Sequence, residues 1–414
     1  MLQFKKNKLG ELCSKIGSGA TPRGGDSSYK SHGISLIRSQ NVHDFTFSKD
    51  GLAFIDEQQA NELSNVELKD RDVLLNITGD SVARVCQVPD EILPARVNQH
   101  VAILRAYKNE LNPEFLKYCL LSRPNKEMLL TLASTGATRK ALTKGMIEEF
   151  EIEIPDEEGI VTQTHIASIL SSLDDKIELN RRTNHTLEQI AQILFKKYFV
   201  DDIDPENLPE GWEVKEISKI ISVKDGTHDS PKQKEIGYYL ITSKHIKDSK
   251  IDFGQAYLIS QQDFEGINKR SKVDTFDILL TMIGTVGVFH LVLEEDIIFA
   301  IKNIGLFKSS ERKDLFEFLY FYLKSNFITE YLEARKSGST QQYLTLDTLR
   351  NIPVILATSN VLADFKQKVN PLLMKIRCND NEISTLTNIR YSLLPKLMSG
   401  EIEINATEKE LVNY

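Results

Sequence analysis

TQTHIASILSSLDDKIELNRRTNHTLEQIAQILFKKYF (residues 162–199) is a stretch without glycine or proline. Its seam positions recur in alternating steps of four and three, which is the heptad pattern of a long helix that packs against another helix. Such a helix spans about 55 Å. Two seam positions are asparagine, which costs stability in a coiled coil but specifies its register. The seam consists of Ile166, Leu170, Leu173, Ile177, Asn180, Asn184, Leu187, Ala191, Leu194 and Tyr198.

A second stretch, residues 362–398, supplies the partner helix. It repeats the seam 199 residues later, and both stretches contain Lys-Ile-x-x-Asn, at Lys176–Asn180 and Lys375–Asn379. Because each helix follows an equivalent block of the chain, a two-fold arrangement pairs the helices antiparallel. Pro371 predicts a kink or a local break in the second helix. The second seam consists of Phe365, Val369, Leu372, Ile376, Asn379, Ile383, Leu386, Arg390, Leu393 and Leu397.

The overall composition is that of a soluble globular protein. The chain has 414 residues, of which 41% are hydrophobic, so two or three domains are expected. It lacks an apolar run of the ~20 residues that span a membrane, and its N-terminus lacks a signal-peptide core, which together predict a cytoplasmic protein. The four cysteines fit neither a disulfide framework nor a zinc site. The net charge of −8 arises mainly in residues 156–208, so the rest of the chain can still present a basic face.

Residues 1–155 are typical of a mixed α/β domain. A short helix is expected to run into a Gly/Ser/Thr/Pro loop over residues 8–25, and an apolar-periodic helix to cover residues 114–122. A polar loop follows at residues 134–143. The expected strands cover residues 34–42, 73–79, 100–106 and 150–155.

Residues 209–355 repeat this order, which makes internal repetition the main organisational feature. DILLTMIG (277–284) aligns with DVLLNITG (72–79) at an offset of 205, and Asn303 aligns with Asn98 at the same offset. SGSTQQYLT (337–345) aligns with TGATRKALT at 202. We therefore predict an α+β fold with two repeated mixed α/β domains, two long helices forming an intramolecular antiparallel coiled coil, and a pseudo-two-fold axis. The predicted segments are 1–155, 156–208, 209–355 and 356–414.

Two similar but non-identical domains at the ends of a rigid helical rod suit the reading of two different short targets along a linear polymer. DNA is such a polymer, with affinity coming from phosphate contacts and specificity from base edges. The rod would then set the spacing between half-sites. The alternative is a coiled-coil adaptor that binds proteins rather than DNA.

Three stretches resemble the specificity (S) subunits of type I restriction-modification systems. They are residues 165–201, LPEGWEVKEI (208–217) and IRYSLLPKLMSGEIEI (389–404). The resemblance implies that the two mixed α/β domains are target-recognition domains, and that the chain is a non-catalytic DNA reader of a bipartite, asymmetric site. It also implies two adenine-N6 methyltransferase subunits docked on the helices, with S-adenosylmethionine bound by that partner. A restriction/motor subunit would bring ATP and Mg, and no cofactor is expected in this chain.

The sequence carries no catalytic motif of its own. It lacks the Asn/Asp-Pro-Pro-aromatic motif of an amino-methyltransferase, a P-loop and an HExxH motif, and the eight histidines show no metal-ligand spacing. Gly17-Ser-Gly19 is an isolated GxG without a third glycine. We therefore expect neither a catalytic residue nor a metal site.

The loops supply the candidate DNA-binding residues, because Arg, Asn and Gln can read base edges while small residues allow close approach to phosphate. Asp72 and Asp277 repeat as well, but they are expected to end a turn before a strand. Phe195 and Phe199 are expected to face outward and bind the partner, and Arg390 to act with the seam asparagines as a register device. The candidates are Ser18, Thr21, Arg23, Arg38, Gln40, Asn41, Arg84, Arg96, Asn98, Gln99, Thr135, Thr138, Arg139, Lys140, Thr227, His228, Lys232, Ser243, Lys244, Lys302, Asn303, Ser339, Thr340, Gln341 and Gln342.

Overall fold

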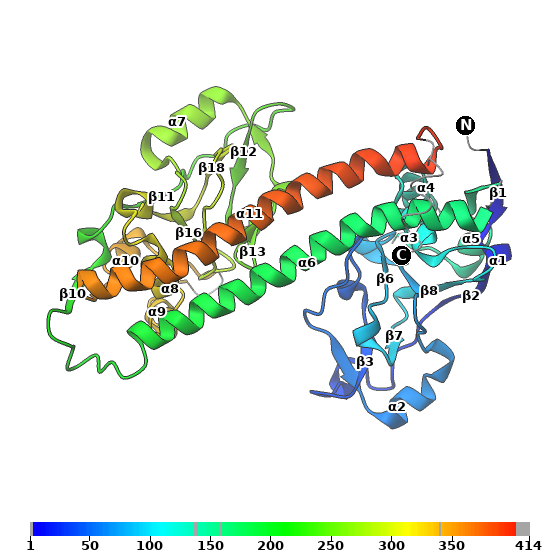
Figure 1. Ribbon diagram of the computed structural model, residues 1–414, viewed down its shortest axis with the longest axis horizontal. Helices are drawn as coiled ribbons and strands as arrows, with labels where there is room; N and C mark the ends of the chain where they lie inside the picture. Colours follow the sequence, from blue (N-terminus) through cyan, green and yellow to red (C-terminus); the bar gives the residue numbers. More distant parts are fainter. Residues whose placement is uncertain (1–2, 136–139, 157–158, 339–340, 403–414) are drawn as a thin grey trace. The chain divides into compact units, whose positions relative to one another are not determined.

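The computed structural model describes residues 3–135, 140–156, 159–338 and 341–402. The chain divides into two compact units, Met1–Leu179 with Glu382–Tyr414 (unit 1) and Asn180–Asn381 (unit 2). Two long helices, α6 (Gly159–Phe199) and α11 (Ser359–Met398), each contribute one part to each unit (Figure 1). The division therefore cuts across both helices, and each unit combines one recognition domain with a portion of the helix pair.

Unit 1 contains three small sheets, and two of them form the body of the first recognition domain. The four-stranded sheet has the order β2-β8-β5-β6, the three-stranded sheet has the order β4-β3-β7, and β1 pairs with β9. The strands are β1 (Phe4–Lys8), β2 (Cys13–Ser18), β3 (Ile34–Ile37), β4 (Ala53–Ile55), β5 (Val73–Asn76), β6 (Val85–Gln87), β7 (Ala95–Val97), β8 (Val101–Ala106) and β9 (Glu151–Pro155). The helices are α1 (Leu9–Leu12), α2 (Glu57–Glu62), α3 (Pro113–Leu121), α4 (Arg123–Ser134) and α5 (Lys144–Glu148).

Unit 2 repeats the topology of these three sheets and adds one further strand pair. Its sheets have the orders β11-β19-β16-β17 and β15-β12-β18, β10 pairs with β20, and β13 pairs with β14. The strands are β10 (Glu213–Glu216), β11 (Val223–Asp225), β12 (Tyr238–Ile241), β13 (Ile246–Lys247), β14 (Lys250–Ile251), β15 (Leu258–Ile259), β16 (Ile278–Thr281), β17 (Phe289–Leu291), β18 (Phe299–Ile301), β19 (Ile304–Phe307) and β20 (Pro353–Leu356). The helices are α7 (Gln261–Ser271), α8 (Phe316–Leu323), α9 (Asn326–Glu333) and α10 (Leu346–Arg350).

The central strands form because their first three residues are apolar on both faces. All four residues of β5 and all four of β16 are buried, which is the pattern of a strand covered on both sides. Their register is the same in the two repeats, since Leu74 faces Ile103 while Leu279 faces Leu306. The predicted α+β repeat is therefore confirmed in the strand order as well as in the sequence.

Within each unit, α6 and α11 pair antiparallel as predicted. In unit 1, Asp174 pairs with Arg390 and Lys176 pairs with Glu382. In unit 2, Asn184 bonds Asp380 and Tyr198 bonds Asp364. Residue numbers therefore fall along α11 as they rise along α6 in both units. All twenty seam positions are buried or partly buried. The heptad pattern thus identified the packed faces of both helices, and Asn379 donates a 2.8 Å hydrogen bond to Asn184 inside the seam.

Three expectations from the sequence were wrong in detail. Residues 13–18 form strand β2 rather than part of a loop, because they pair with β8. The strand predicted at residues 34–42 is shorter, since β3 ends at Ile37 and a 3₁₀ turn follows at Ser39–Asn41; the equivalent turn Ser243–His245 follows β12. The local break predicted at Pro371 is absent, because the proline lies on the exposed side of α11, where water can satisfy the carbonyl that loses its partner; a kink there stays a prediction.

Candidate nucleic-acid interface

A buried aspartate supports the sheet beneath the candidate loops in both repeats. Asp72 accepts two 2.7 Å hydrogen bonds from Arg105, and Asp277 accepts one of 2.5 Å from Lys308. Each carboxylate also accepts the backbone N–H three residues earlier, at Lys69 and at Asp274. Burial raises the pKa of Asp277 even though the Lys308 ammonium opposes the shift. The prediction that both aspartates end a turn before a strand is confirmed.

A repeat-related glycine brings the first loop of each domain against the end of a neighbouring strand. A Cβ on Gly19 would lie 2.0 Å from the Val97 carbonyl oxygen, and one on Gly226 would lie 2.4 Å from that of Ile301. The next residues, Ala20 and Thr227, donate backbone hydrogen bonds to these same carbonyls. The glycines are therefore required by packing within the fold, and they hold the first loop beside the turn after β7 or β18.

In unit 1, the first loop, the segment after β5 and the polar loop before residue 143 meet near the turn after β7. Gly79 donates a backbone hydrogen bond to Lys140, and Ile77 donates one to His100. Thr78 Oγ1 lies 2.7 Å from His100 Nδ1, and the Gln99 amide lies 3.2 Å from the same ring. The candidates here with exposed side chains are Ser18, Arg23, Gln99, Thr135 and Lys140, and Thr21 and Arg84 are partly exposed.

The turn after β3 forms a second cluster in unit 1. Gln40 is exposed, whereas the Arg38 guanidinium is partly buried and donates a 2.6 Å hydrogen bond to the Gly51 carbonyl. Asn41 is fully buried and ties the turn to residues 48–50 by two hydrogen bonds from its amide. The turn thus presents Gln40 outward while Asn41 holds its backbone in place.

Unit 2 builds the equivalent surface from different side chains. His228 lies between two oxygen atoms, with Nε2 3.1 Å from Asp225 and Nδ1 2.7 Å from the Asn303 amide oxygen. Asp225 also pairs with Arg270, and Lys302 donates to Ser230. The exposed candidates in unit 2 are His228, Lys232, Lys244, Gln341 and Gln342, with Thr227, Lys302 and Asn303 partly exposed.

The strand register corrects one correspondence between the repeats. Val97 ends β7, which pairs with β3, and Ile301 ends β18, which pairs with β12. The next residue in each repeat donates an equivalent backbone hydrogen bond, from Asn98 to Ile37 and from Lys302 to Ile241. Asn98 therefore corresponds to Lys302, not to Asn303. The sequence alignment was off by one because the turn before β19 is one residue shorter than the turn before β8.

Four candidate side chains are buried. Arg96 donates to the Ala60 and Ala95 carbonyls and pairs with Glu67, and Asn98 accepts the His100 N–H. Asn41 and Ser243 are buried in the repeat-related 3₁₀ turns. In the described conformation these side chains support the loops from inside. Thr138, Arg139, Ser339 and Thr340 lie outside the described residues.

The expectation that Phe195 and Phe199 face outward was wrong. Their side chains are only 5% and 7% exposed. Phe195 lies 6.2 Å from Phe318 and 6.1 Å from Phe365 between ring centroids, within the core of unit 2. Both rings lie outside the seam of the helix pair and pack against Phe318 of α8. Heptad position alone therefore does not distinguish a helix face that packs against a domain from a face that is exposed.

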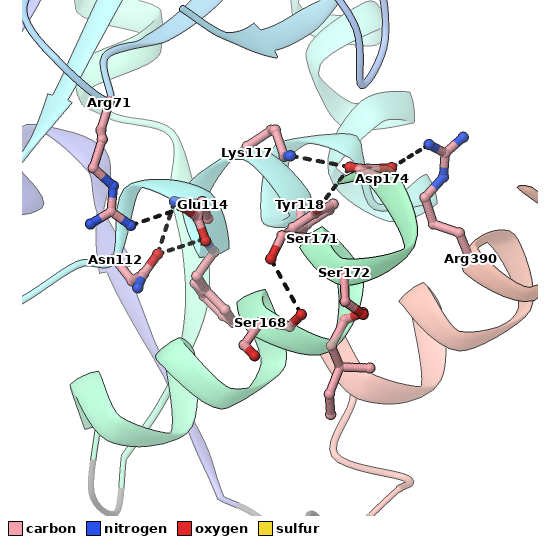
Figure 2. Close-up of polar contacts among 12 residues, drawn as sticks. Arg71, Asn112, Glu114, Lys117, Tyr118, Ser168, Ser171, Ser172, Asp174 and Arg390 are labelled. Atoms are coloured by element: carbon pink, nitrogen blue, oxygen red, sulfur yellow. Dashed lines mark hydrogen bonds and ion pairs between the residues drawn. The ribbon is translucent and has the colours of Figure 1, made fainter. Parts of the chain in front are cut away.

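The sequence analysis did not predict a buried polar cluster in unit 1, although one of its members, Arg390, occupies a seam position. Asp174 accepts hydrogen bonds from Tyr118 at 2.6 Å, Arg390 at 2.5 Å and Lys117 at 3.2 Å, so α3, α6 and α11 meet at one carboxylate (Figure 2). Burial, and then the Asp174 charge, raise the pKa of Tyr118. The available signal was Lys117 within an otherwise apolar helix, since such a lysine needs a buried partner.

Two features common to other functional classes are not found among the described residues. Over residues 3–135, 140–156, 159–338 and 341–402, no group of His, Cys, Asp and Glu side chains is placed to hold a metal ion. Across those same ranges, no helix combines the length and the apolar character that crossing a bilayer requires.

Comparison with known proteins identifies the family. Residues 1–189 and 209–368 match the type I restriction modification DNA specificity domain. The chain is 29% identical over 322 residues to the type I restriction enzyme MjaIX specificity subunit of Methanocaldococcus jannaschii, covering 72% of this chain and 71% of that protein. It is 27% identical over 424 residues to the HindI specificity subunit of Haemophilus influenzae, covering 82% and 90%.

The fold agrees with this assignment. A crystal structure of the S subunit of a type I restriction-modification system from M. genitalium superposes with a TM-score of 0.56 at 16% identity, covering 98% of this chain and 97% of that one. The match at this identity concerns the fold alone, and it spans both repeats. Together with the two matched domains, it shows that the chain belongs to the type I restriction-modification DNA specificity family and is a specificity subunit of such a system.

Proposed function

We propose that each recognition domain reads one half of a bipartite, asymmetric DNA site. The observation that carries this proposal is that the two repeats share one loop framework but present different side chains from it. Gln40 in unit 1 corresponds to Lys244 in unit 2, and both are exposed, while the partly exposed Lys302 stands where unit 1 has the buried Asn98. Because base edges are read by side-chain hydrogen-bonding pattern, two frameworks with different side chains suit two different half-sites.

The exposed candidates have the chemistry for such a surface. Glutamine amides can bond adenine bidentately, arginine and lysine can bond guanine or phosphate, and serine and threonine hydroxyls can bond either. We propose that the chain itself is non-catalytic. S-adenosylmethionine would bind to the adenine-N6 methyltransferase partner, and ATP and Mg to the restriction partner.

The helix pair is the proposed spacer and docking surface. With Phe195 and Phe199 buried, the outward apolar residues of the helices become the candidates for partner contact. Ile190 on α6 and Ile389 on α11 are 42% and 39% exposed and stand 199 residues apart, which is the repeat of the seam itself. A surface that occurs twice in one chain suits two copies of one partner, the methyltransferase subunit.

Recognition of two half-sites is tested by expressing the chain with the methyltransferase subunit of its own system and mapping methylated adenines across the host genome. A single bipartite motif with two different halves is expected. Replacing residues 209–355 with the equivalent segment of another specificity subunit should change one half only. A stable complex without any sequence-selective, salt-dependent DNA binding would instead support the adaptor alternative.

Docking is tested separately. Ile190→Asp and Ile389→Asp should each remove one methyltransferase copy, measured as the mass of the purified complex, while the nearby exposed Gln189→Ala leaves both copies bound. Loss of both copies in either variant, or of neither in both, would contradict two equivalent sites.

Insertion of one heptad in each long helix should lengthen the unread spacer. An unchanged spacer in an active complex would contradict the role of the helix pair in spacing.

A further inference from the structure

Arg390 does more in unit 1 than maintain the register of the helix pair. Its side chain is 6% exposed, and NH1 bonds Asp174 at 2.5 Å. The guanidinium carbon also lies 3.6 Å from the centroid of the Phe45 ring, which belongs to the recognition domain. A guanidinium stacked on an aromatic face and paired with a carboxylate is held in one plane, which a lysine cannot reproduce.

Phe45 lies in a strained turn that contacts from neighbouring residues hold in place. Its φ of 68° is in the left-handed region, which is unfavourable for a bulky side chain. The turn is held by a hydrogen bond from Phe45 N to Val85 O and by Asp44, which accepts 2.6 Å and 3.2 Å bonds from Lys126 Nζ and Val85 N. The Tyr391 ring meets Phe45 edge-on at 5.7 Å, so α11 covers the ring from two adjacent residues.

The same turn is joined to the candidate DNA surface. It directly follows the 3₁₀ turn Ser39–Asn41, and the buried Asn41 amide bonds the carbonyls of Ser48 and Asp50 on the far side of the loop. Arg38 and Gln40 both bond the Gly51 carbonyl. A displacement of Phe45 therefore moves the loop on which Arg38 and Gln40 depend for their position.

We propose that Arg390 is a positioning residue for recognition of the first half-site, because it holds the Phe45 turn, and with it the Arg38–Gln40 segment, against the helix pair. This inference rests on the proposed function, in which the first recognition domain reads one half-site. Arg390 touches no base in this proposal and acts through Phe45.

The second repeat supplies an internal control, because it lacks this arrangement. The residue 199 positions before Arg390 is Ala191. The corresponding turn in unit 2 again has a residue in the left-handed region, Ser249 with φ of 59°, but the next residue joins it to α11 by an exposed pair between Lys250 and Asp380. A change at Arg390 should accordingly leave recognition of the second half-site intact.

The test uses the complex with the methyltransferase subunit and three duplexes: the mapped site, the site with one base pair changed in the first half, and the site with one changed in the second half. Arg390→Lys keeps the positive charge opposite Asp174 but loses the planar stacking on Phe45. We expect the preference for the intact site over the first-half variant to fall roughly fivefold, measured as the ratio of Kd values. The preference over the second-half variant should stay unchanged.

Two further variants separate positioning from general stability. Phe45→Leu leaves the Asp174–Arg390 pair in place and should give the same half-specific loss, and the double variant should lose no more than either single variant. Lys176→Gln removes the exposed Lys176–Glu382 pair between the same helices and should affect neither half-site. If Arg390→Lys fails to fold, Phe45→Leu carries the test alone.

Equal loss at both half-sites, or unchanged preference in both Arg390→Lys and Phe45→Leu, would overturn the inference. Failure of the proposed function would look different, since the unaltered complex would then yield no bipartite motif from which to build the three duplexes.

Discussion

The core helices α3 and α8 stand at the same place in the two recognition domains, but around one position of the helix pair they pack by different chemistry. Elsewhere α8 has polar attachments as well, since Tyr320 and Lys324 bond Glu188 of α6, and Glu317 accepts a hydrogen bond from Asn370 of α11. In unit 1, Lys117 and Tyr118 of α3 converge with Arg390 on the buried Asp174 carboxylate. In unit 2, the positions that correspond to Asp174 and Arg390 by the 199-residue repeat are Leu373 and Ala191, both buried. Aromatic rings fill that region, with Phe199 4.8 Å from Phe318 and 5.0 Å from Phe365.

The difference shows that the repeat preserves backbone topology while the chemistry of attachment is free to change. Burying aromatic rings is favourable without a unique geometry, because the hydrophobic effect is not directional. A buried ion pair gains little net stability, since desolvation offsets most of the attraction, but each donor must point at the carboxylate. We infer that the packing around the Asp174 position is the more geometrically specific in unit 1, and that the packing at the equivalent Leu373 position of unit 2 is the more adaptable.

Asp174→Ala should have the largest effect, because it leaves Lys117 and Arg390 buried without their carboxylate. We expect unit 1 to lose about 3–5 kcal/mol, measured by native-state hydrogen exchange of its core amides. Lys176→Gln, which breaks a half-exposed pair between the same helices, should cost less than about 1 kcal/mol. Equal losses in the two variants would show that the buried cluster has no special role.

Phe195→Leu places in unit 2 the residue that unit 1 has at the equivalent position, Leu394. It removes ring contacts with Phe199, Phe318 and Phe365 and should cost about 2 kcal/mol, measured by hydrogen exchange of unit 2. Phe327→Leu is the control, because Phe327 is 45% exposed beside the same core and should change stability by less than about 0.5 kcal/mol. A neutral Phe195→Leu would mean that this region repacks freely.

Glu317→Gln should stabilise unit 2 at neutral and higher pH. Burial raises the pKa of Glu317 above its ordinary value of 4.5, and one carboxylate oxygen has no hydrogen-bond partner. The folded state therefore holds its proton more tightly than the unfolded state, so the wild-type chain loses stability as pH rises from 4.5 through the folded pKa. The gain from Glu317→Gln should reach about 1 kcal/mol above that range and vanish below it, as measured by thermal unfolding across pH.

The matched control for this change is Glu114, which stands at the same place in α3. Glu114 is partly exposed and pairs with Arg71 at 3.1 Å. Glu114→Gln should therefore bring no gain at any pH. A similar gain from both variants would show that the effect does not come from burial of Glu317.

Lys250→Gln should have the smallest effect. The Lys250–Asp380 pair is exposed on both sides, so its loss should cost about 0.5 kcal/mol at low ionic strength and nothing measurable near 1 M salt, where the Debye length is about 3 Å. Salt-dependent hydrogen exchange of β13 and β14 is the measurement. A loss that persists at high salt would show that Lys250 contributes packing rather than charge.

The long helices and the repeat were predictable from sequence because their signal is periodic. All twenty seam positions are buried or partly buried, since a heptad pattern marks a packed face wherever a partner helix exists. The buried runs of β5 and β16 were predictable for a similar reason, since a short continuous apolar run with turn signals indicates a covered strand. The short strand β2 was missed because it alternates poorly and its pairing with β8 joins residues far apart in the chain.

The candidate interface was only partly predictable. Turn residues such as Gln40 and His228 are exposed as expected, but Asn41 and Arg96 are buried and bond backbone carbonyls. Residue type alone does not separate these two groups, because an amide or a guanidinium suits a buried carbonyl as well as a base edge. The neighbouring strands decide which of the two a given side chain meets.

The sequence by itself determined the duplication, the antiparallel helix pair and the family, because these depend on patterns repeated along many residues. Tertiary structure alone decided that Phe195 and Phe199 are buried, that Asn98 corresponds to Lys302, and that Arg390 joins Asp174 to Phe45. Each of these results depends on a few side chains from distant segments that meet in space. Packing and electrostatics in the folded chain determine these contacts, and the periodicity of the sequence does not predict them.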